Sequence, residues 1–380
     1  MATETVEDSK LTLGWLKIDS FRGLKGIELD RMASANLLIG GNNSGKSSVL
    51  EAVAIFSAPF RLARWADVAL ARSETTDFDP AAAIEAIRWL FPRERGVGGD
   101  SFGHGAIAIS GGQDSFYNKL IGLHSRSGNR LTADISRLKG IDPSQRRKGI
   151  NEGWKLSTAF GAVPIPSVLD IVPRDVDLWS SSDIRDEENN DSQLPIDLLT
   201  PYSHRTTAYS LSALSNAVID DFKDEIVKLL ASLEPDIRDV VILTDDTGQR
   251  PQLAIRHTRH GVVPATIFGD GIRRALAMAL GVRKAAHGIL LIDEIEAALH
   301  LHSLKTLFPW LVQACKQHKV QLIATTHSLK ALDAIGGTWD EANDHDYAAF
   351  RLPPNGQGEV KRYTGGMLRR LVHEGGLDIR

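Results

Sequence analysis

The sequence predicts an α/β protein with a mixed sheet core and helices, an antiparallel β lobe, and a helical/β insertion. A short apolar strand at residues 36–40 runs straight into a glycine-rich loop, and helical spacing follows at residues 45–56. The last third of the chain alternates between helical patterns and nearly continuous apolar strands, which indicates a buried parallel sheet. Residues 100–173 contain short alternating runs separated by turn residues, which is typical of antiparallel strands.

Each expected element follows from the spacing of its apolar residues and from the turn residues beside it. In chain order we expect strands at 11–21, 24–30 and 36–40, helices at 45–56 and 80–91, the β region at 100–173, a helix at 211–234, two strands within 237–257, a helix at 270–286, a strand at 288–293, a helix at 296–318, a strand at 319–326, a helix at 328–335, a strand pair near 346–363 and a short helix at 365–374. The polar, acidic residues 180–195 predict a mobile surface loop. We find no internal repeat, and no heptad run is long enough for a coiled-coil arm.

Composition excludes several classes of protein. The chain has 380 residues with 44 basic and 48 acidic side chains, a formal charge of −4, which does not suit a protein that coats nucleic acid through bulk charge. The single cysteine, Cys315, excludes an intramolecular disulfide framework and a cysteine-rich zinc site. The N-terminus lacks the pattern of a secretory signal, and no apolar run reaches the length of a membrane span. We therefore expect a cytoplasmic protein without a membrane partner.

The glycine-rich loop fits the phosphate-binding pattern G-x-x-x-x-G-K-[ST] at every fixed position. Its glycines let successive backbone N–H groups wrap a phosphate, and the helix that follows adds its positive N-terminal dipole. We expect Lys46 to reach the β- and γ-phosphates of ATP and Ser47 to place its hydroxyl on Mg²⁺. The predicted nucleotide-binding residues of this loop are Gly40, Gly41, Asn42, Asn43, Ser44, Gly45, Lys46, Ser47 and Ser48.

Two acidic residues and a histidine follow the next predicted strands. Asp293 ends an apolar strand, where a carboxylate holds Mg²⁺ beside a phosphate loop, and the adjacent Glu294 is placed to polarise an attacking water. His327 follows the strand after that and is expected to sense the γ-phosphate, so Glu294, His327 and Lys46 are the predicted catalytic residues. Glu296 with His300 and His302 allows two interpretations, a metal site at helical spacing or a subunit contact next to the nucleotide, and we favour the contact.

A further turn, Gly269-Asp270-Gly271, opens a predicted helix about twenty residues before Asp293. A G-x-G sequence at this place is explained equally by a simple helix cap. It gains meaning only in combination with the phosphate loop, the acidic strand end and the histidine.

Together these motifs resemble the ABC-type or AAA ATPases of the SMC, RecF and OLD group, and more closely the short ATPase subunits of bacterial antiphage defence systems of the PARIS and Septu kind. The motifs that carry the resemblance are FRGL (21–24) before GGNNSGKSS, FGDGIRRAL (268–276), LLIDEIEAALH (290–300), ATTHS (324–328) and the C-terminal GGLDIR (375–380). The resemblance implies the fold of a P-loop NTPase of ABC-ATPase type. It covers residues 11–56 and 268–380 well and the middle of the chain only loosely.

The resemblance also implies a division of the chain and a partner. Residues 1–99 and 268–380 are expected to form the two parts of the ATPase domain, with 100–267 as a variable second lobe. It implies a head-to-head dimer or higher oligomer in which Gly269, Asp270 and Gly271 of one subunit contact the nucleotide of the other. Only 52 residues (380 − 328) follow Ser328, too few for a TOPRIM nuclease domain, so the effector is expected to be a separate protein.

The chain departs from the family where the usual signature turn has a serine, because Gly269 stands there and its missing hydroxyl puts rapid hydrolysis in doubt. A Q-loop glutamine is not assigned, since Gln113, Gln145 and Gln193 are equivalent candidates. Asp344-His345-Asp346 mimics a metal-binding sequence and is interpreted as a loop.

Three functions remain in view. The first is an ATPase subunit whose nucleotide state controls a TOPRIM-like or HNH nuclease or a toxin in antiphage defence. The second is a RecF-like DNA repair ATPase, for which Arg146-Arg147-Lys148 is the one compact basic cluster available for DNA contact. The third is a scaffold that holds ATP without turnover. Gly269 favours this scaffold mildly, while the presence of Glu294 argues against it.

Overall fold

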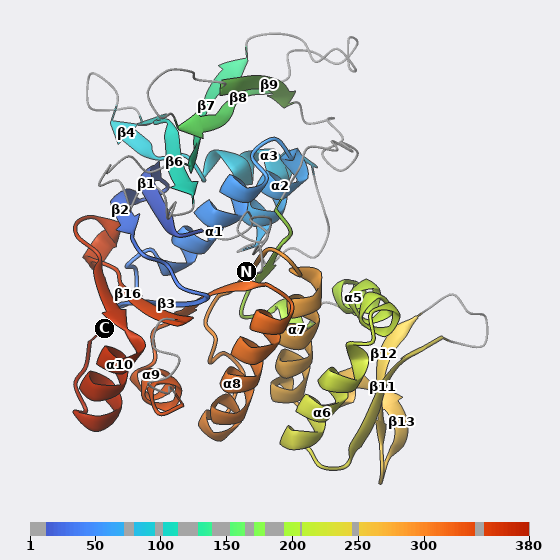
Figure 1. Cartoon of the computed structure of the whole chain (residues 1–380). Helices are drawn as coiled ribbons and strands as arrows, with labels where there is room; N and C mark the ends of the chain where they lie inside the picture. The colour runs from blue at the N-terminus through green and yellow to red at the C-terminus, as the bar shows by residue number, and fades with distance from the viewer. Residues whose placement is uncertain are drawn as a thin grey trace, which may run out of the picture. The chain divides into compact units, whose positions relative to one another are not determined.

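The chain forms two compact units, each assembled from separated stretches of sequence (Figure 1). The structure is a computed structural model that describes residues 13–71, 80–95, 102–112, 128–138, 153–163, 171–178, 194–205, 207–244, 251–338 and 346–379. Unit 1 consists of Met1–Met32, Gly41–Leu194 and Leu352–Lys361, and unit 2 of Ala33–Gly40, Pro195–Arg351 and Arg362–Arg380. The two units therefore interleave along the chain, and the three-part division at residues 99 and 267 stays a prediction.

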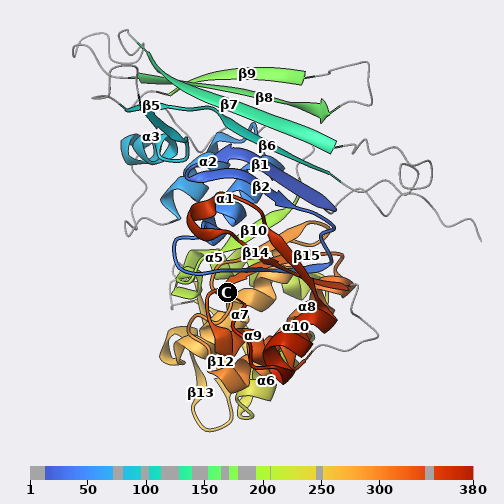
Figure 2. The same cartoon turned by 90° about the vertical axis from the view of Figure 1, so that its left-hand side faces the viewer.

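Unit 1 is built on a six-stranded antiparallel sheet, whose later strands run alongside one another in Figure 2. In spatial order the strands are β2 (Leu24–Leu29), β1 (Trp15–Phe21), β6 (Ile107–Gly112), β7 (Gly128–Leu138), β8 (Gly153–Val163) and β9 (Ile171–Leu178). Every neighbouring pair is antiparallel, so the predicted antiparallel β region is confirmed for these strands. Unit 1 also contains the short pair β4 (Arg93–Arg95) and β5 (Phe102–His104) and the helices α1 (Lys46–Ser57), α2 (Leu62–Leu70) and α3 (Pro80–Arg88).

Unit 2 is built on the buried parallel sheet that the last third of the sequence predicts. In spatial order its strands are β10 (Ile196–Leu199), β14 (Ile289–Ile292), β15 (Gln321–Thr326), β3 (Ala35–Ile39), β16 (Tyr347–Arg351) and β17 (Lys361–Thr364). The pairs from β10 to β16 are parallel. Strands β3, β14 and β15 are buried along their whole length, which explains why their sequences do not alternate between apolar and polar residues.

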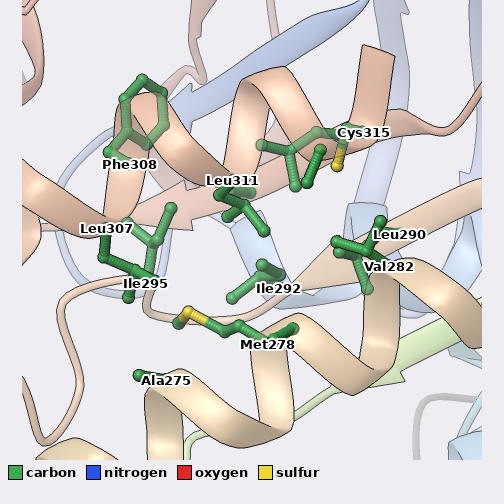
Figure 3. Close-up of a cluster of buried hydrophobic side chains, with 14 of the residues drawn as sticks. Ala275, Met278, Val282, Leu290, Ile292, Ile295, Leu307, Phe308, Leu311 and Cys315 are labelled. Carbon is green, nitrogen blue, oxygen red and sulfur yellow. The ribbon is translucent and has the colours of Figure 1, made fainter. Parts of the chain in front are cut away.

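Helices α7 (Asp270–Lys284) and α8 (Leu301–Gln317) lie side by side and cover this sheet (Figure 1). Met278 of α7 and Leu311 of α8 meet Ile292 of β14 in the core of the unit, as Figure 3 shows. Helix α9 (Leu329–Gly336), helix α10 (Gly365–Leu368) and a π-helical turn at Arg369–Glu374 complete this part of the unit. Among the described helices, none combines the length and the apolar character needed to cross a membrane.

A smaller three-stranded sheet extends unit 2. Its strands are β11 (Ile237–Leu243), β12 (Gln252–His257) and β13 (Gly261–Pro264), all antiparallel, and helices α5 (Thr207–Ile219) and α6 (Lys223–Leu233) precede it. The prediction of two strands within residues 237–257 is confirmed.

Several predicted elements differ from the structure. The helix expected at 296–318 begins only at Leu301, because Glu294 and Ala298 adopt left-handed backbone angles (φ 48° and 61°) that a right-handed helix excludes. The helix expected at 211–234 is two helices, separated near Asp221, whose φ is 56°. The short elements α2, β4, β10 and β13 were not predicted, since three to nine residues carry little periodic signal.

Candidate functional site

The phosphate-binding loop of unit 1 has the backbone conformation that its sequence demands. Asn43 and Gly45 adopt left-handed φ angles of 63° and 84°, and Gly45 is the N-cap of α1. The Lys46 ammonium donates a hydrogen bond of 2.8 Å to the carbonyl oxygen of Gly41, so the lysine side chain folds over the loop. Gly41 and Asn42 are exposed, which leaves the rim of the loop accessible to a phosphate.

The FRGL sequence supports this loop from behind. A Cβ atom on Gly45 would lie 2.4 Å from Cδ2 of Leu24, so only glycine fits where the loop enters α1. Arg22 forms an ion pair with Glu51 of α1, with 2.7 Å between Nε and Oε2. Leu24 and Arg22 thus hold the loop and its helix against strands β1 and β2, a packing role that the motif match alone did not reveal.

In unit 2, three adjacent strands deliver the predicted residues to one edge of the sheet. Strands β14, β15 and β3 are parallel, and Thr326 at the end of β15 lies in register with Ile39 at the end of β3. The chain leaves this edge into Asp293 after β14, into His327 after β15 and into Gly40 after β3. Gly40 is the first residue of the phosphate-loop sequence, so the chain enters that loop from the edge that carries the acid and the histidine.

Thr325, the second-last residue of β15, organises the two acidic residues. Its hydroxyl donates to Oδ1 of Asp293 at 2.6 Å and accepts the backbone N–H of Glu294 at 2.8 Å. Glu294 itself has a left-handed φ of 48°, a conformation that costs a non-glycine residue about 1–3 kcal/mol and that clusters at functional sites. The fully buried threonine therefore fixes the direction of the Asp293 carboxylate and the backbone of Glu294, although nothing in the sequence singled it out.

His327 lies against both glutamates of the acidic turn. Its Nδ1 is 3.5 Å from Oε1 of Glu294 and 3.7 Å from Oε1 of Glu296. His300, the N-cap of α8, and His302 are exposed. Glu296 hydrogen-bonds to the turn of His327, so the alternative of a metal site made by Glu296 with these two histidines is not supported.

Residues 171–333 match the AAA_21 family, described as "AAA domain, putative AbiEii toxin, Type IV TA system". This match, the strand order of the parallel sheet and the phosphate-loop sequence indicate the same fold. The fold is that of a P-loop ATPase of the ABC type. Residues 171–333 are therefore similar to an ATPase-type domain.

The other comparisons give a short alignment or a low sequence identity. An uncharacterized protein of Methanocaldococcus jannaschii, MJECL11, is 40% identical over 68 residues, which are 18% of this chain and 60% of that protein. An SMC head bound to the C-terminal winged-helix domain of ScpA aligns with 13% identity and a TM-score of 0.46, covering 93% of this chain and 97% of the other. The Thermotoga maritima SMC head domain aligns with 10% identity and a TM-score of 0.40, over 93% and 99% of the two chains.

The turn predicted to take the signature position, Gly269-Asp270-Gly271, opens helix α7, whose N-cap is Gly269. Asp270 accepts hydrogen bonds from Arg205 (2.7 Å) and Arg273 (3.2 Å). The hydrogen bond from Arg205 is the largest cause of the lowered pKa of the Asp270 carboxyl. A Cβ atom on Gly271 would lie 3.3 Å from the carbonyl oxygen of Ala298, so the turn packs closely against the segment after Glu294. Two guanidinium groups on one carboxylate leave the N-terminus of α7 with a net positive charge.

Arg274 is the important residue that sequence reasoning missed. Its side chain is 0% exposed, and its guanidinium donates to the carbonyl oxygens of Thr200, Asp293 (2.9 Å) and Glu294 (3.4 Å). Burial lowers the pKa of Arg274 to about 10, against the opposite effect of the nearby carboxylates. Arg274 therefore holds the backbone of the acidic turn from within. An arginine inside the apolar pattern IRRALAMAL was the available signal.

His204 is buried behind the same turn. Its side chain is 2% exposed, Nε2 lies 3.5 Å from Oδ1 of Asp270, and neither ring nitrogen makes a hydrogen bond within the described residues. Burial is the main cause of its lowered pKa, which means that the folded chain favours the neutral imidazole.

The lowered pKa of His204 predicts acid sensitivity. As the pH falls, the unfolded chain takes up this proton first, so the contribution to stability is complete above about pH 6.5 and is lost below it. The slope cannot exceed one proton, or about 1.4 kcal/mol per pH unit. His204→Phe should flatten the fall in melting temperature between about pH 7 and pH 5, whereas His302→Phe, at an exposed position, should not. An unchanged slope in His204→Phe contradicts the prediction.

A second group in unit 2 combines Glu234, Asp236 and His257, whose oxygen and nitrogen atoms all lie within 4.8 Å of one another. Asp236 is ion-paired with Arg259, and the backbone N–H of Arg259 donates to Nδ1 of His257 at 3.2 Å. Because Nδ1 accepts a hydrogen bond, the proton of the neutral ring lies on Nε2, the nitrogen nearer Glu234. These residues form a hydrogen-bonded corner of the small sheet, and the Arg259 guanidinium supplies the positive charge beside the carboxylates.

Several predicted features lie outside the described residues. They are the Q-loop candidates Gln113, Gln145 and Gln193, the basic cluster Arg146-Arg147-Lys148, and most of the acidic loop at 180–195. Of the Asp344-His345-Asp346 sequence only Asp346 is described, and it pairs with Lys316 at 3.0 Å.

Proposed function

We propose that this chain is an ATPase subunit that binds ATP with Mg²⁺, hydrolyses it slowly and uses the nucleotide state to control a separate effector protein. The observation that carries the proposal is the convergence of three chain exits at one sheet edge. Asp293 and Glu294 leave β14 there, His327 leaves β15, and Gly40 leads into the phosphate loop. This arrangement fits a triphosphate and a divalent cation at the carboxyl edge of a parallel sheet.

In this proposal the backbone N–H groups of the loop and Lys46 bind the phosphates. The donors offered to a cation are the Ser47 hydroxyl and the Asp293 carboxylate, the hard oxygen ligands that Mg²⁺ prefers. The hydrogen bond from Thr325 fixes the direction of Asp293, which fits a metal-binding role. The cation supplies charge neutralisation on the phosphates, while Glu294 accepts the proton of the attacking water.

Self-association completes the proposed site. The turn at Gly269–Gly271 is expected to meet the nucleotide of a second copy of the chain, where its net positive charge suits a polyphosphate. Two large side chains of unit 2, Tyr202 and Ile267, are both 68% exposed. Exposed aromatic and aliphatic side chains of this kind are typical of the centre of an interface.

A separate nuclease or toxin as the effector follows from the motif resemblance, since the family description applies its toxin–antitoxin wording to the AAA domain itself. Antiphage defence is the setting that the motif resemblance favours. The second candidate is an ATP-dependent scaffold without turnover. One observation favours it: Gly269 stands where the usual signature turn has a serine, so the hydroxyl that would meet a γ-phosphate is absent.

The test is steady-state ATP turnover and mass measurement with and without Mg-ATP. Lys46→Ala should lose nucleotide affinity and turnover by about a hundredfold or more, since it removes the cation that binds the phosphates. Lys25→Ala, which changes an exposed lysine of β2, is the matched control and should behave as wild type. ATP binding that does not depend on Lys46 contradicts the proposed site.

A further inference from the structure

Glu296 lies between the acidic turn, Asp293–Glu294, and the turn that carries His327, and its carboxylate is hydrogen-bonded to the histidine turn. Its Oε1 accepts a hydrogen bond from the Thr326 hydroxyl at 2.8 Å and a second from the backbone N–H of His327 at 3.2 Å. The side chain is 17% exposed, and Oε2 is buried without a hydrogen-bond partner within the described residues. The carboxylate therefore faces the protein instead of solvent.

These hydrogen bonds continue into the start of the next helix. The Thr326 hydroxyl, which donates to Glu296, also accepts the backbone N–H of Ser328 at 3.1 Å. The Ser328 hydroxyl then caps helix α9 by accepting the N–H of Ala331 at 3.2 Å. Glu296 is thus the first acceptor in a chain of bonds that fixes the backbone on both sides of His327.

The consequence is a defined position for the imidazole. His327 Nδ1 lies 3.5 Å from Glu294 and 3.7 Å from Glu296, so the ring stands between the two carboxylates. The Glu294 contact is between two half-exposed side chains. Since such an exposed contact holds a ring weakly, the hydrogen bonds that Glu296 accepts from the Thr326 hydroxyl and the His327 backbone N–H are the stronger constraint on where the histidine lies.

We propose that Glu296 is a positioning residue that acts through His327, holding the imidazole against Glu294. The inference rests on the proposed ATPase function and adds to it a residue for which no nucleotide-binding or catalytic role was predicted. Positioning of this kind affects the chemical step and not the affinity for the nucleotide, because Glu296 is turned toward the protein.

A double-mutant cycle tests the proposal. Glu296→Ala should lower kcat for ATP by about tenfold to a hundredfold, with KM changed less than about twofold. Glu296→Gln keeps an acceptor oxygen of the same geometry and should recover most of the loss. Because Glu296 acts through the histidine, Glu296→Ala/His327→Ala should be no slower than His327→Ala alone. Losses that multiply in the double variant, or a loss confined to KM, overturn the proposal.

Two further variants guard against a merely structural effect. Thr326→Val removes the hydroxyl that donates a hydrogen bond to Glu296. The double variant Thr326→Val/Glu296→Ala should therefore have the same kcat as Glu296→Ala alone. Glu234→Ala is the matched control, a glutamate 3.9 Å from His257 on the small sheet, and should leave kcat unchanged. If Glu296→Ala does not fold, Glu296→Gln and Thr326→Val carry the same comparison. An additive effect of Thr326→Val with the Glu296 variant overturns the proposal.

A readout without ATP separates this inference from the proposed function. With ¹³C-labelled histidine, the ring signal of His327, assigned by its loss in His327→Ala, should shift or broaden in Glu296→Ala and stay in place in Glu234→Ala. If the wild type turns over no ATP yet this signal changes, the ATPase proposal fails and the positioning role stands. A His327 signal that is unchanged in Glu296→Ala overturns the positioning role itself.

Discussion

Glu294→Gln should bind ATP as tightly as the wild type but lose turnover by at least about a hundredfold. The amide has the size and shape of the carboxylate but cannot accept the proton of an attacking water. The backbone at this position is held by the Thr325 hydroxyl and by Arg274, so the substitution should leave the turn in place. With the chemical step blocked, the ATP-bound closed oligomer should accumulate and be visible as an ATP-dependent increase in mass. The measurement is turnover and mass for both proteins with Mg-ATP.

Glu359→Gln is the control for this experiment, since it makes the same chemical change at an exposed glutamate of unit 1. Its turnover and mass should equal those of the wild type. If wild type and Glu294→Gln both bind ATP without turnover and keep one unchanged assembly, Glu294 is not a general base. The ATP-dependent scaffold would then become the leading function. If the two turn over ATP equally fast, the assignment of Glu294 as the base is wrong although the ATPase function stands.

Arg274→Met should destabilise the chain by about 3–5 kcal/mol and strongly reduce turnover. Methionine occupies a similar path through the core but leaves the carbonyl groups of Thr200, Asp293 and Glu294 without the guanidinium that now binds them. It also removes the buried positive charge that balances the acidic turn. The expected result is a lower urea midpoint, together with loss of activity in the protein that remains folded.

Arg238→Met is the matched control, because this exposed arginine of β11 donates a side-chain hydrogen bond of 2.9 Å to the Thr258 hydroxyl. Its free energy of unfolding, measured by urea denaturation, should change by less than about 0.5 kcal/mol. Arg274→Lys keeps a positive charge but not the planar fork, and should fall between Met and the wild type. A midpoint for Arg274→Met equal to that of Arg238→Met would contradict the role assigned to the buried arginine.

The sequence by itself determined the local chemistry and much of the sheet. The phosphate-loop pattern requires a glycine at position 45, and in the structure Gly45 has a left-handed backbone and packs closely on Leu24. The continuous apolar runs of β14 and β15 predicted a buried parallel sheet, and parallel strands bring their carboxyl ends to one edge. The order of Asp293, Glu294 and His327 at these strand ends followed from the same rule, and their proposed roles in ATP chemistry stay predictions.

Only the tertiary structure decided which distant residues support that edge. Arg274, Thr325 and Glu296 are separated from their partners by between 19 and 74 positions in the chain, and no periodicity links such pairs. Glu296 illustrates the difference, since its sequence neighbours suggested His300 and His302, while the left-handed turn at Glu294 and Ala298 directs it to Thr326 and His327 instead. Spacing rules assume a regular helix or strand. Where the backbone leaves both, the partner of a side chain is set by the packing of the surrounding elements.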